Sequence, residues 1–223
     1  MADESAVHSR DTGGVYHERQ RLQLCLLHAL NNLLQGENAF TRKELDDIAD
    51  RLPAMTSSSE RWRPWSLILK RHRNSLTGDY DVNVLIAALA SRQKDVKWYD
   101  RRKGVQGLNV DEYGSQLVGI IVNVPSKRFW NLWTGRHWVA LRAVNGRWYN
   151  LDSDFPTPRA FAHGEADLKK YLEAVFAESG EVLIVTEGKA DGNRRNYMSR
   201  AIHRKNSAEH RIPCVGEASA ASS

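Results

Sequence analysis

The chain has 223 residues, 41% of them hydrophobic and 26% charged, which is enough for one domain with a substantial core. Its two cysteines, Cys25 and Cys214, are too few for a disulfide framework, and its apolar runs are far shorter than the roughly 18 residues that a membrane helix needs. The first residues, MADESAVHSR, hold no apolar signal core. We therefore expect a soluble intracellular protein, cytoplasmic with the nucleus as a second location, and no membrane span.

The net charge of +5 is concentrated near the C-terminus. Residues 188–223 hold seven basic and three acidic side chains, which is +4, so the rest of the chain is close to neutral. A near-neutral body opposes a nucleic-acid function, which needs basic side chains gathered on the binding surface. We expect a disordered N-terminal segment at 1–13, one domain at 14–187, and a basic, disordered tail at 188–223 without a specific nucleic-acid partner.

The first elements along the chain are predicted to be helices. A helix is expected over residues 25–35, where leucines supply an apolar face and Gly36 is placed to end it. A second helix begins at Thr41, because Thr41 and Glu44 have the spacing of a capping box. It should end before Pro53, which disfavours helical backbone in the residue that precedes it.

The middle of the chain separates an irregular stretch from a third helix. Residues 56–74 mix serine, proline, tryptophan and charge without a clear period, which favours an arm or lid beside the core. Asp81 is then placed to cap a helix, since its carboxylate can accept bonds from the first free amides. The apolar residues that follow recur at helical spacing: Val82, Leu85, Ile86 and Leu89.

From Val96 onward the pattern changes to that of strands. Runs rich in β-branched and aromatic residues are separated by glycine and proline: VKWYD, QLVGIIVNV, HWVALRAV and RWYNLDS. Asn145-Gly146 joins the last two, because both positions tolerate the positive φ of a type I′ hairpin. A helix over 165–179 and a strand EVLIVTE complete the domain. Helices first and strands afterwards predict an α+β class.

One set of side chains has the types needed for cysteine hydrolase chemistry. Cys25 lies at the predicted start of a helix, where free amides favour the thiolate. Gln20 can join the backbone N–H of Cys25 in holding an oxyanion. His137 in the aromatic strand can serve as a base, oriented by Asp152 or Asp154.

Each of these residues has a commoner structural explanation when it is taken alone. Free cysteine is one of the most buried residue types, a histidine in a strand is more often part of the core, and Gln20 can be a surface glutamine. His28 lies three residues after Cys25, and we interpret it as a buried structural histidine because a base on the same helix as Cys25 has no carboxylate to orient it. The combination, rather than any single residue, indicates a catalytic site.

Hairpin register leaves the orienting carboxylate open. With a two-residue turn, Val144 faces Arg147, and counting outward places His137 opposite Asp154 and diagonal to Asp152. Both carboxylates then share a sheet face with the imidazole. Register alone does not decide between them. Phe155-Pro156 is expected to end strand pairing before residue 154, which favours Asp152 and makes Asp154 a solvated turn residue.

Three segments resemble the signature segments of Josephin-domain proteins: YHERQRLQLCLLHALNNLLQ, GDYDVNVLIAAL and RHWVALRAVNGRWYNLDS. The resemblance covers residues 14–187. It implies a papain-like cysteine protease fold, with N-terminal helices and a helical arm packed on an antiparallel sheet, that cleaves ubiquitin from its conjugates. Nothing after residue 187 resembles the ubiquitin-interacting helices or glutamine tract of the ataxin branch, so the chain is more similar to the small Josephin-only members.

The resemblance also implies a role for individual residues. Cys25 becomes the nucleophile, His137 the general base and Asp152 the orienting group, since N-L-D-S matches the family pattern. Gln20 becomes the oxyanion donor. Two residues are expected to contact the substrate: Val82 and Trp138.

Two functions of different classes follow from this set. One is a cysteine-type deubiquitinase that hydrolyses peptide or isopeptide bonds at the ubiquitin C-terminus through a Cys-His-Asp triad. The alternative is a ubiquitin-binding adaptor whose site is weakly active or idle. Either one is expected to be a monomer with ubiquitin and ubiquitinated proteins as partners. Neither needs a cofactor or a metal ion.

Overall fold

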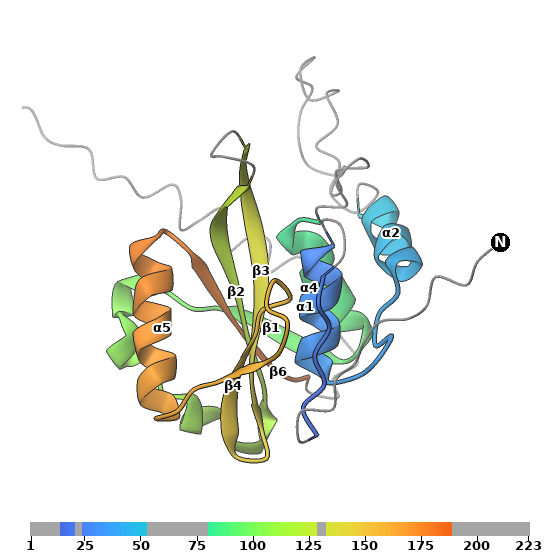
Figure 1. Ribbon diagram of the computed structural model, residues 1–223. Coiled ribbons are helices and arrows are strands. Elements are labelled where there is room, and N and C mark those ends of the chain that lie inside the picture. Colours follow the sequence, from blue (N-terminus) through green and yellow to red (C-terminus); the bar gives the residue numbers. More distant parts are fainter. Residues whose placement is uncertain (1–13, 21–23, 53–79, 129–132, 189–223) are drawn as a thin grey trace, which may run out of the picture. The chain divides into compact units, whose positions relative to one another are not determined.

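A six-stranded antiparallel sheet forms the centre of the fold, with helices on both of its faces (Figure 1). The computed structural model describes the following residues: 14–20, 24–52, 80–128 and 133–188. The predicted arm at 56–74 and segment 1–13 lie outside them, as does the tail beyond residue 188. No helix in the described ranges has the length and apolar character to cross a membrane. The α+β prediction is confirmed.

The three helices expected in the first half of the chain are present: α1 (Cys25–Leu34), α2 (Arg42–Arg51) and α4 (Val82–Ser91). Thr41 and Glu44 form the predicted capping box, and the Asp81 carboxylate accepts hydrogen bonds from the backbone N–H groups of Asn83 and Val84 in the first turn of α4. The end of α1 differs from the prediction. Gln35, with φ of 57°, takes the left-handed cap position instead of Gly36.

The strands follow the predicted segments, and their bounds are β1 (Lys94–Trp98), β2 (Leu117–Arg128), β3 (Trp133–Val144), β4 (Arg147–Leu151), β5 (Arg159–Ala160) and β6 (Glu181–Glu187). Their order in the sheet is β1-β6-β2-β3-β4-β5. Asn145 and Gly146 have φ of 51° and 76°, as the predicted hairpin requires. The short edge strand β5 was not predicted, nor were three 3-10 helices: Arg101–Lys103, Val105–Gly107 and Val110–Gln116.

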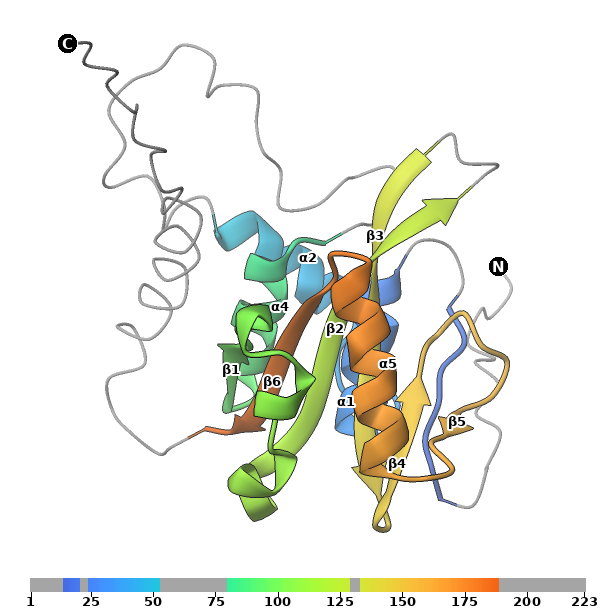
Figure 2. The same ribbon diagram turned by 90° about the vertical axis from the view of Figure 1, so that its left-hand side faces the viewer.

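The two faces of the sheet are covered by different helices (Figures 1 and 2). On one face α1 packs on β2 and β3, and α4 packs on β1. The other face is covered by α5 (Glu165–Ala177), whose Leu168 and Leu172 are fully buried. Because α1 lies against the central strands, its first residue is held close to the middle of the sheet.

Gly119 of β2 lies where α1 and the neighbouring strand β3 leave no room for a side chain. A Cβ there would lie 2.6 Å from the carbonyl oxygen of Leu141 and 2.8 Å from Cδ1 of Leu33. We expect Gly119→Ala to lower the free energy of unfolding by about 1 to 3 kcal/mol, the usual cost of overpacking a core. Urea unfolding measures the change. Gly135→Ala is the matched control, since a Cβ at Gly135 meets nothing within 4 Å. Equal effects of the two substitutions would contradict the explanation.

Candidate active site

Cys25 is the first residue of α1 and is only 3% exposed. Leu24 stands at the cap position, and its apolar side chain cannot occupy the free amides of the first turn. These amides carry a partial positive charge that favours a negative group beside them. The thiol therefore lies where a thiolate is stabilised and where the Cys25 N–H can bind an oxyanion.

His137 on β3 links Cys25 to a carboxylate. Its Nε2 lies 2.6 Å from Oδ1 of Asp152, and its side chain also forms a hydrogen bond with Cys25. Burial opposes the charged ring, but the hydrogen bonds to Asp152 and Cys25 outweigh it and raise the pKa of His137 from 6.5 to about 10. At neutral pH the ring is therefore already protonated. This differs from a neutral base that waits for the thiol proton.

Asp152 reaches His137 from a turn instead of from the sheet. Hairpin pairing begins as predicted, with Val144 opposite Arg147, but it ends at the pair Ala140 and Leu151. The expected positions of Asp154 opposite His137 and of Asp152 on the diagonal are therefore wrong. Asp152 instead opens a turn that the bond from Phe155 N to Asp152 O closes at 3.0 Å.

Asp154 is more closely engaged than a solvated turn residue would be. Its side chain is 48% exposed, yet its Oδ2 lies 3.6 Å from Nε2 of His137, and its Oδ1 accepts a hydrogen bond from Nε2 of Gln20. Gln20 also donates its backbone N–H to Ser153 O at 2.8 Å, and its Oε1 accepts from the Ser153 hydroxyl at 3.5 Å. Asp154 and Ser153 thus set the orientation of the Gln20 amide, which has a second N–H for other acceptors.

The two residues expected to contact substrate differ in their placement. Val82 is half-buried at the start of α4. Trp138 is 3% exposed, and its Nε1 donates to Tyr80 O at 3.2 Å. The buried Trp138 side chain therefore supports the backbone before α4, and its contact with a substrate stays a prediction.

The N-terminal segment (residues 14–20) is held along α1 by two side-chain amides. The Gln35 amide accepts from Tyr16 N at 2.9 Å and donates to Tyr16 O at 3.1 Å. The Asn32 amide does the same for Glu18, accepting from its N at 2.6 Å and donating to its O at 3.3 Å. Each carboxamide thus binds the N–H and the C=O of one residue of the segment, as the backbone of a neighbouring β-strand would. The segment that carries Gln20 is fixed to the helix that carries Cys25.

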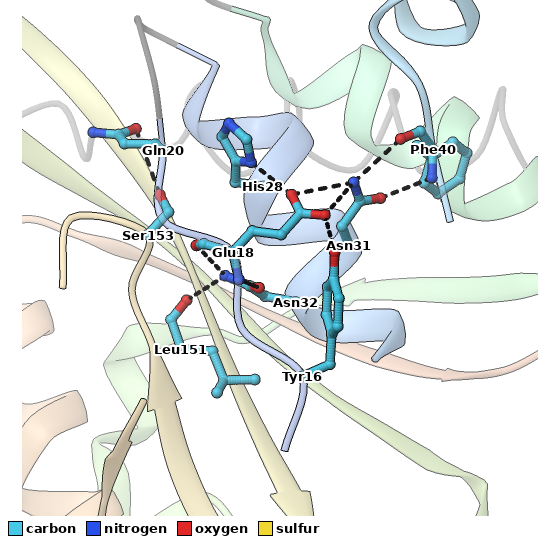
Figure 3. Close-up of polar contacts among 9 residues, drawn as sticks. All are labelled: Tyr16, Glu18, Gln20, His28, Asn31, Asn32, Phe40, Leu151 and Ser153. Carbon is cyan, nitrogen blue, oxygen red and sulfur yellow. Dashed lines mark hydrogen bonds and ion pairs between the residues drawn. The ribbon is translucent and has the colours of Figure 1, made fainter. Parts of the chain in front are cut away.

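A buried carboxylate, Glu18, forms the centre of a polar cluster beside the site (Figure 3). Its oxygens accept hydrogen bonds from Tyr16 Oη, from His28 Nδ1 at 2.6 Å and from Asn31 Nδ2 at 3.0 Å. Burial, with the neighbouring Glu18 as the next cause, raises the pKa of Tyr16, so its hydroxyl stays a neutral donor. The argument that His28 lacks an orienting carboxylate is wrong, since Glu18 supplies one from outside the helix.

Sequence reasoning did not single out Glu18, Asn31 or Asn32. The available signal was the pair Asn31-Asn32 in an otherwise apolar helix, where both residues prove to be almost fully buried. Buried amides need partners, so a polar pair in such a helix indicates a hydrogen-bonded cluster.

Within the described ranges one group of side chains has the spacing for a metal ion. The donor atoms of His137, Asp152 and Asp154 lie within 4.8 Å of one another. The 2.6 Å separation of His137 Nε2 and Asp152 Oδ1 is that of a direct charge-assisted hydrogen bond. The group is therefore explained by an oriented imidazole without a metal.

Comparison with known proteins identifies similar sequences across this region. The Josephin family model matches residues 20–186. A Josephin-like protein of Arabidopsis thaliana is 51% identical over 147 residues, which cover 66% of this chain and 41% of that protein. Josephin-2 of Mus musculus is 42% identical over 177 residues, covering 77% of this chain and 85% of the relative. An ataxin-3 homolog of Arabidopsis thaliana is 28% identical over 174 residues, which cover 75% of this chain and 55% of that protein.

The raised pKa of His137 predicts a pH-dependent contribution to stability. A group whose pKa is higher in the folded state stabilises that state fully below the unfolded pKa, here 6.5, and loses the contribution as pH rises through about 10. The difference in free energy of unfolding between wild type and His137→Gln should therefore shrink from pH 6 to pH 10. Urea unfolding at several pH values measures it.

Asp152→Asn provides the control, because it removes the partner that raises the His137 pKa most. When His137→Gln is added to Asp152→Asn, the resulting change in the free energy of unfolding should depend much less on pH than it does when His137→Gln is made in the wild type. A difference that stays constant over this range in the wild type would contradict the raised pKa.

Proposed function

Because this chain belongs to the Josephin family, known as cysteine-protease-like deubiquitinase domains, we propose that it is a cysteine-type deubiquitinase. The observation that carries the proposal is the chain of contacts from Cys25 through His137 to Asp152 at the start of α1. This is the arrangement of nucleophile, imidazole and orienting group that acyl transfer requires. We propose ubiquitin and ubiquitinated proteins as its partners.

The proposed reaction begins at the Cys25 thiolate. It attacks the carbonyl carbon of the peptide or isopeptide bond at the ubiquitin C-terminus, and a carbon–sulfur bond forms while the carbonyl oxygen becomes an oxyanion. The Cys25 N–H and the Gln20 amide donate hydrogen bonds to that oxyanion. The His137 imidazolium then gives its proton to the leaving amine as the carbon–nitrogen bond breaks, leaving a thioester.

Hydrolysis of the thioester uses the same groups in the reverse order. His137, now neutral, takes a proton from water, and the resulting hydroxide attacks the thioester carbonyl. The thiolate leaves and the ubiquitin carboxylate is released. Asp152 keeps Nε2 of the ring occupied, so that the other ring nitrogen serves the thiol throughout the cycle.

Substrate contacts outside the triad are proposed from position alone. Val82, at the start of α4, lies eight residues after the stretch 56–74 that is expected to form the arm, and it is proposed to contact ubiquitin. The proposed catalytic domain is residues 14–187, flanked by the segments 1–13 and 188–223.

A ubiquitin that carries a C-terminal electrophile tests the reaction type directly. We expect the full-length chain to form a one-to-one covalent adduct, since the activated thiolate attacks where the scissile carbonyl would lie. Intact-mass spectrometry detects the adduct, and peptide mapping should place it on Cys25. Cys25→Ala should abolish labelling.

The matched control is Cys214→Ala, which should label like wild type. Binding of ubiquitin without any adduct would instead support the adaptor function. An adduct on Cys214 would contradict the assignment of the nucleophile.

The two carboxylates near His137 are expected to differ in importance. Asp152 lies 2.6 Å from Nε2 and Asp154 lies 3.6 Å from it, so Asp152 provides most of the orientation. Asp152→Ala should lower kcat/KM for a ubiquitin C-terminal reporter at least roughly tenfold, about 1.4 kcal/mol of transition-state stabilisation, with Asp154→Ala much milder. Circular dichroism checks folding. The opposite ranking in two folded variants would assign the orienting role to Asp154.

A further inference from the structure

Asp152 lies just outside the paired part of the sheet. The β3–β4 pairing ends at Leu151, one residue before Asp152, and the backbone then turns between Asp152 and Phe155. Hydrogen bonds between strands therefore cannot fix the distance from Asp152 to His137. The contacts that hold the end of β4 in place therefore determine the position of the Asp152 carboxylate.

Asn32 of α1 provides such a contact. Its Nδ2 donates to Leu151 O at 3.0 Å and to Glu18 O at 3.3 Å, while its Oδ1 accepts from Glu18 N at 2.6 Å (Figure 3). The side chain is fully buried and uses both ends of its amide. Asn32 also follows Cys25 by seven residues, two helical turns, so the two share a side of one rigid helix.

We propose that Asn32 is a positioning residue for Asp152, joining the end of β4 to the helix that carries Cys25. The inference rests on the proposed function for its catalytic consequence, because a triad needs its carboxylate at a fixed distance from the imidazole. Through Asn32, one helix fixes both the nucleophile and the chain segment that orients the base.

Further contacts hold the same turn against the N-terminal segment. Gln20 N donates to Ser153 O at 2.8 Å, and His17 lies 3.1 Å from Phe155 O through its Nε2. Since a carbonyl oxygen only accepts, this Nε2 carries the proton. Figure 2 shows the segment running beside the chain that follows β4. Asn32 alone among these residues binds the segment, the end of β4 and the helix at once.

Asn31 provides a matched control on the same helix. It is also a buried asparagine, and its Nδ2 donates to the Glu18 carboxylate. Its remaining contacts go to Phe40, whose N–H it binds at 2.7 Å and whose carbonyl it binds at 3.2 Å. No bond from Asn31 reaches the turn after β4 among those of the described residues. Loss of either amide should weaken the Glu18 cluster, but only loss of Asn32 should release Leu151.

The titration of His137 reports the position of Asp152 without any catalysis. The ring is faced by Cys25 from α1 and by Asp152 and Asp154 from the turn. Around Asp152 itself, His17 approaches from the N-terminal segment and Tyr171 from α5. Asp152 is the partner that raises the His137 pKa most, so a displaced Asp152 should lower that pKa toward its ordinary value.

The experiment compares Asn32→Ala and Asn31→Ala in the full chain, with folding checked by circular dichroism and urea unfolding. NMR of labelled histidines should show a lower His137 pKa in Asn32→Ala and an unchanged one in Asn31→Ala. On a ubiquitin C-terminal reporter, Asn32→Ala should lower kcat about tenfold with little change in KM. In an Asp152→Ala background, Asn32→Ala should cause no further loss of kcat.

The outcomes separate this proposal from the proposed function. If the wild type neither labels with the ubiquitin electrophile nor cleaves the reporter, the deubiquitinase proposal fails, while the His137 titration still decides the role of Asn32. A folded Asn32→Ala with unchanged His137 pKa, or an equal shift in Asn31→Ala, would overturn the assignment.

Asn32→Ser covers the case in which Asn32→Ala does not fold. Its hydroxyl keeps a polar group at the position but is too short to join Glu18 to Leu151, so the same shift in His137 pKa is expected. If neither variant folds, Asn32 acts on the whole domain and its specific assignment to Asp152 is overturned.

Discussion

The buried carboxylate of Glu18 is the constraint on which the site depends. An unpaired buried charge costs several kcal/mol, so the fold must bring donors to Glu18, and Tyr16, His28 and Asn31 provide them. Two of these donors lie on α1 and one on the N-terminal segment. Satisfying one charge therefore fixes the segment that carries Gln20 against the helix that carries Cys25, although Glu18 itself lies outside the proposed triad.

The electrostatics of the proposed triad follow from burial combined with pairing. Burial alone would keep His137 neutral, but Asp152 and Cys25 reverse that tendency and favour the charged ring. The protonated imidazole and the free amides of the first turn of α1 are both placed beside the Cys25 thiol. The pair lies in a region of low exposure, where such interactions are less screened than at the surface.

The sequence predicted most elements because their signals are local. The Thr41 capping box, the Asp81 cap and the Asn145-Gly146 hairpin each depend on backbone geometry within a few residues, and all three are confirmed. Asp152 does reach His137, but hairpin counting wrongly placed it within the sheet, because the counting assumes that pairing continues past Leu151. Pairing stops at Leu151, where the Asn32 side chain donates a hydrogen bond to the Leu151 carbonyl oxygen, which would otherwise bind another strand or water.

The residue types of the site were determined by the sequence, and their mutual placement by the tertiary structure. A thiol before an apolar helix, a distant histidine in a strand and nearby carboxylates indicate one class of chemistry wherever they occur. That Glu18 would orient His28, that Asp154 would hold Gln20 and that Trp138 would be buried depends on contacts across at least ten residues of chain. Such contacts form only when a buried polar group must find a partner in the packed fold, and local sequence patterns do not record which partner is within reach.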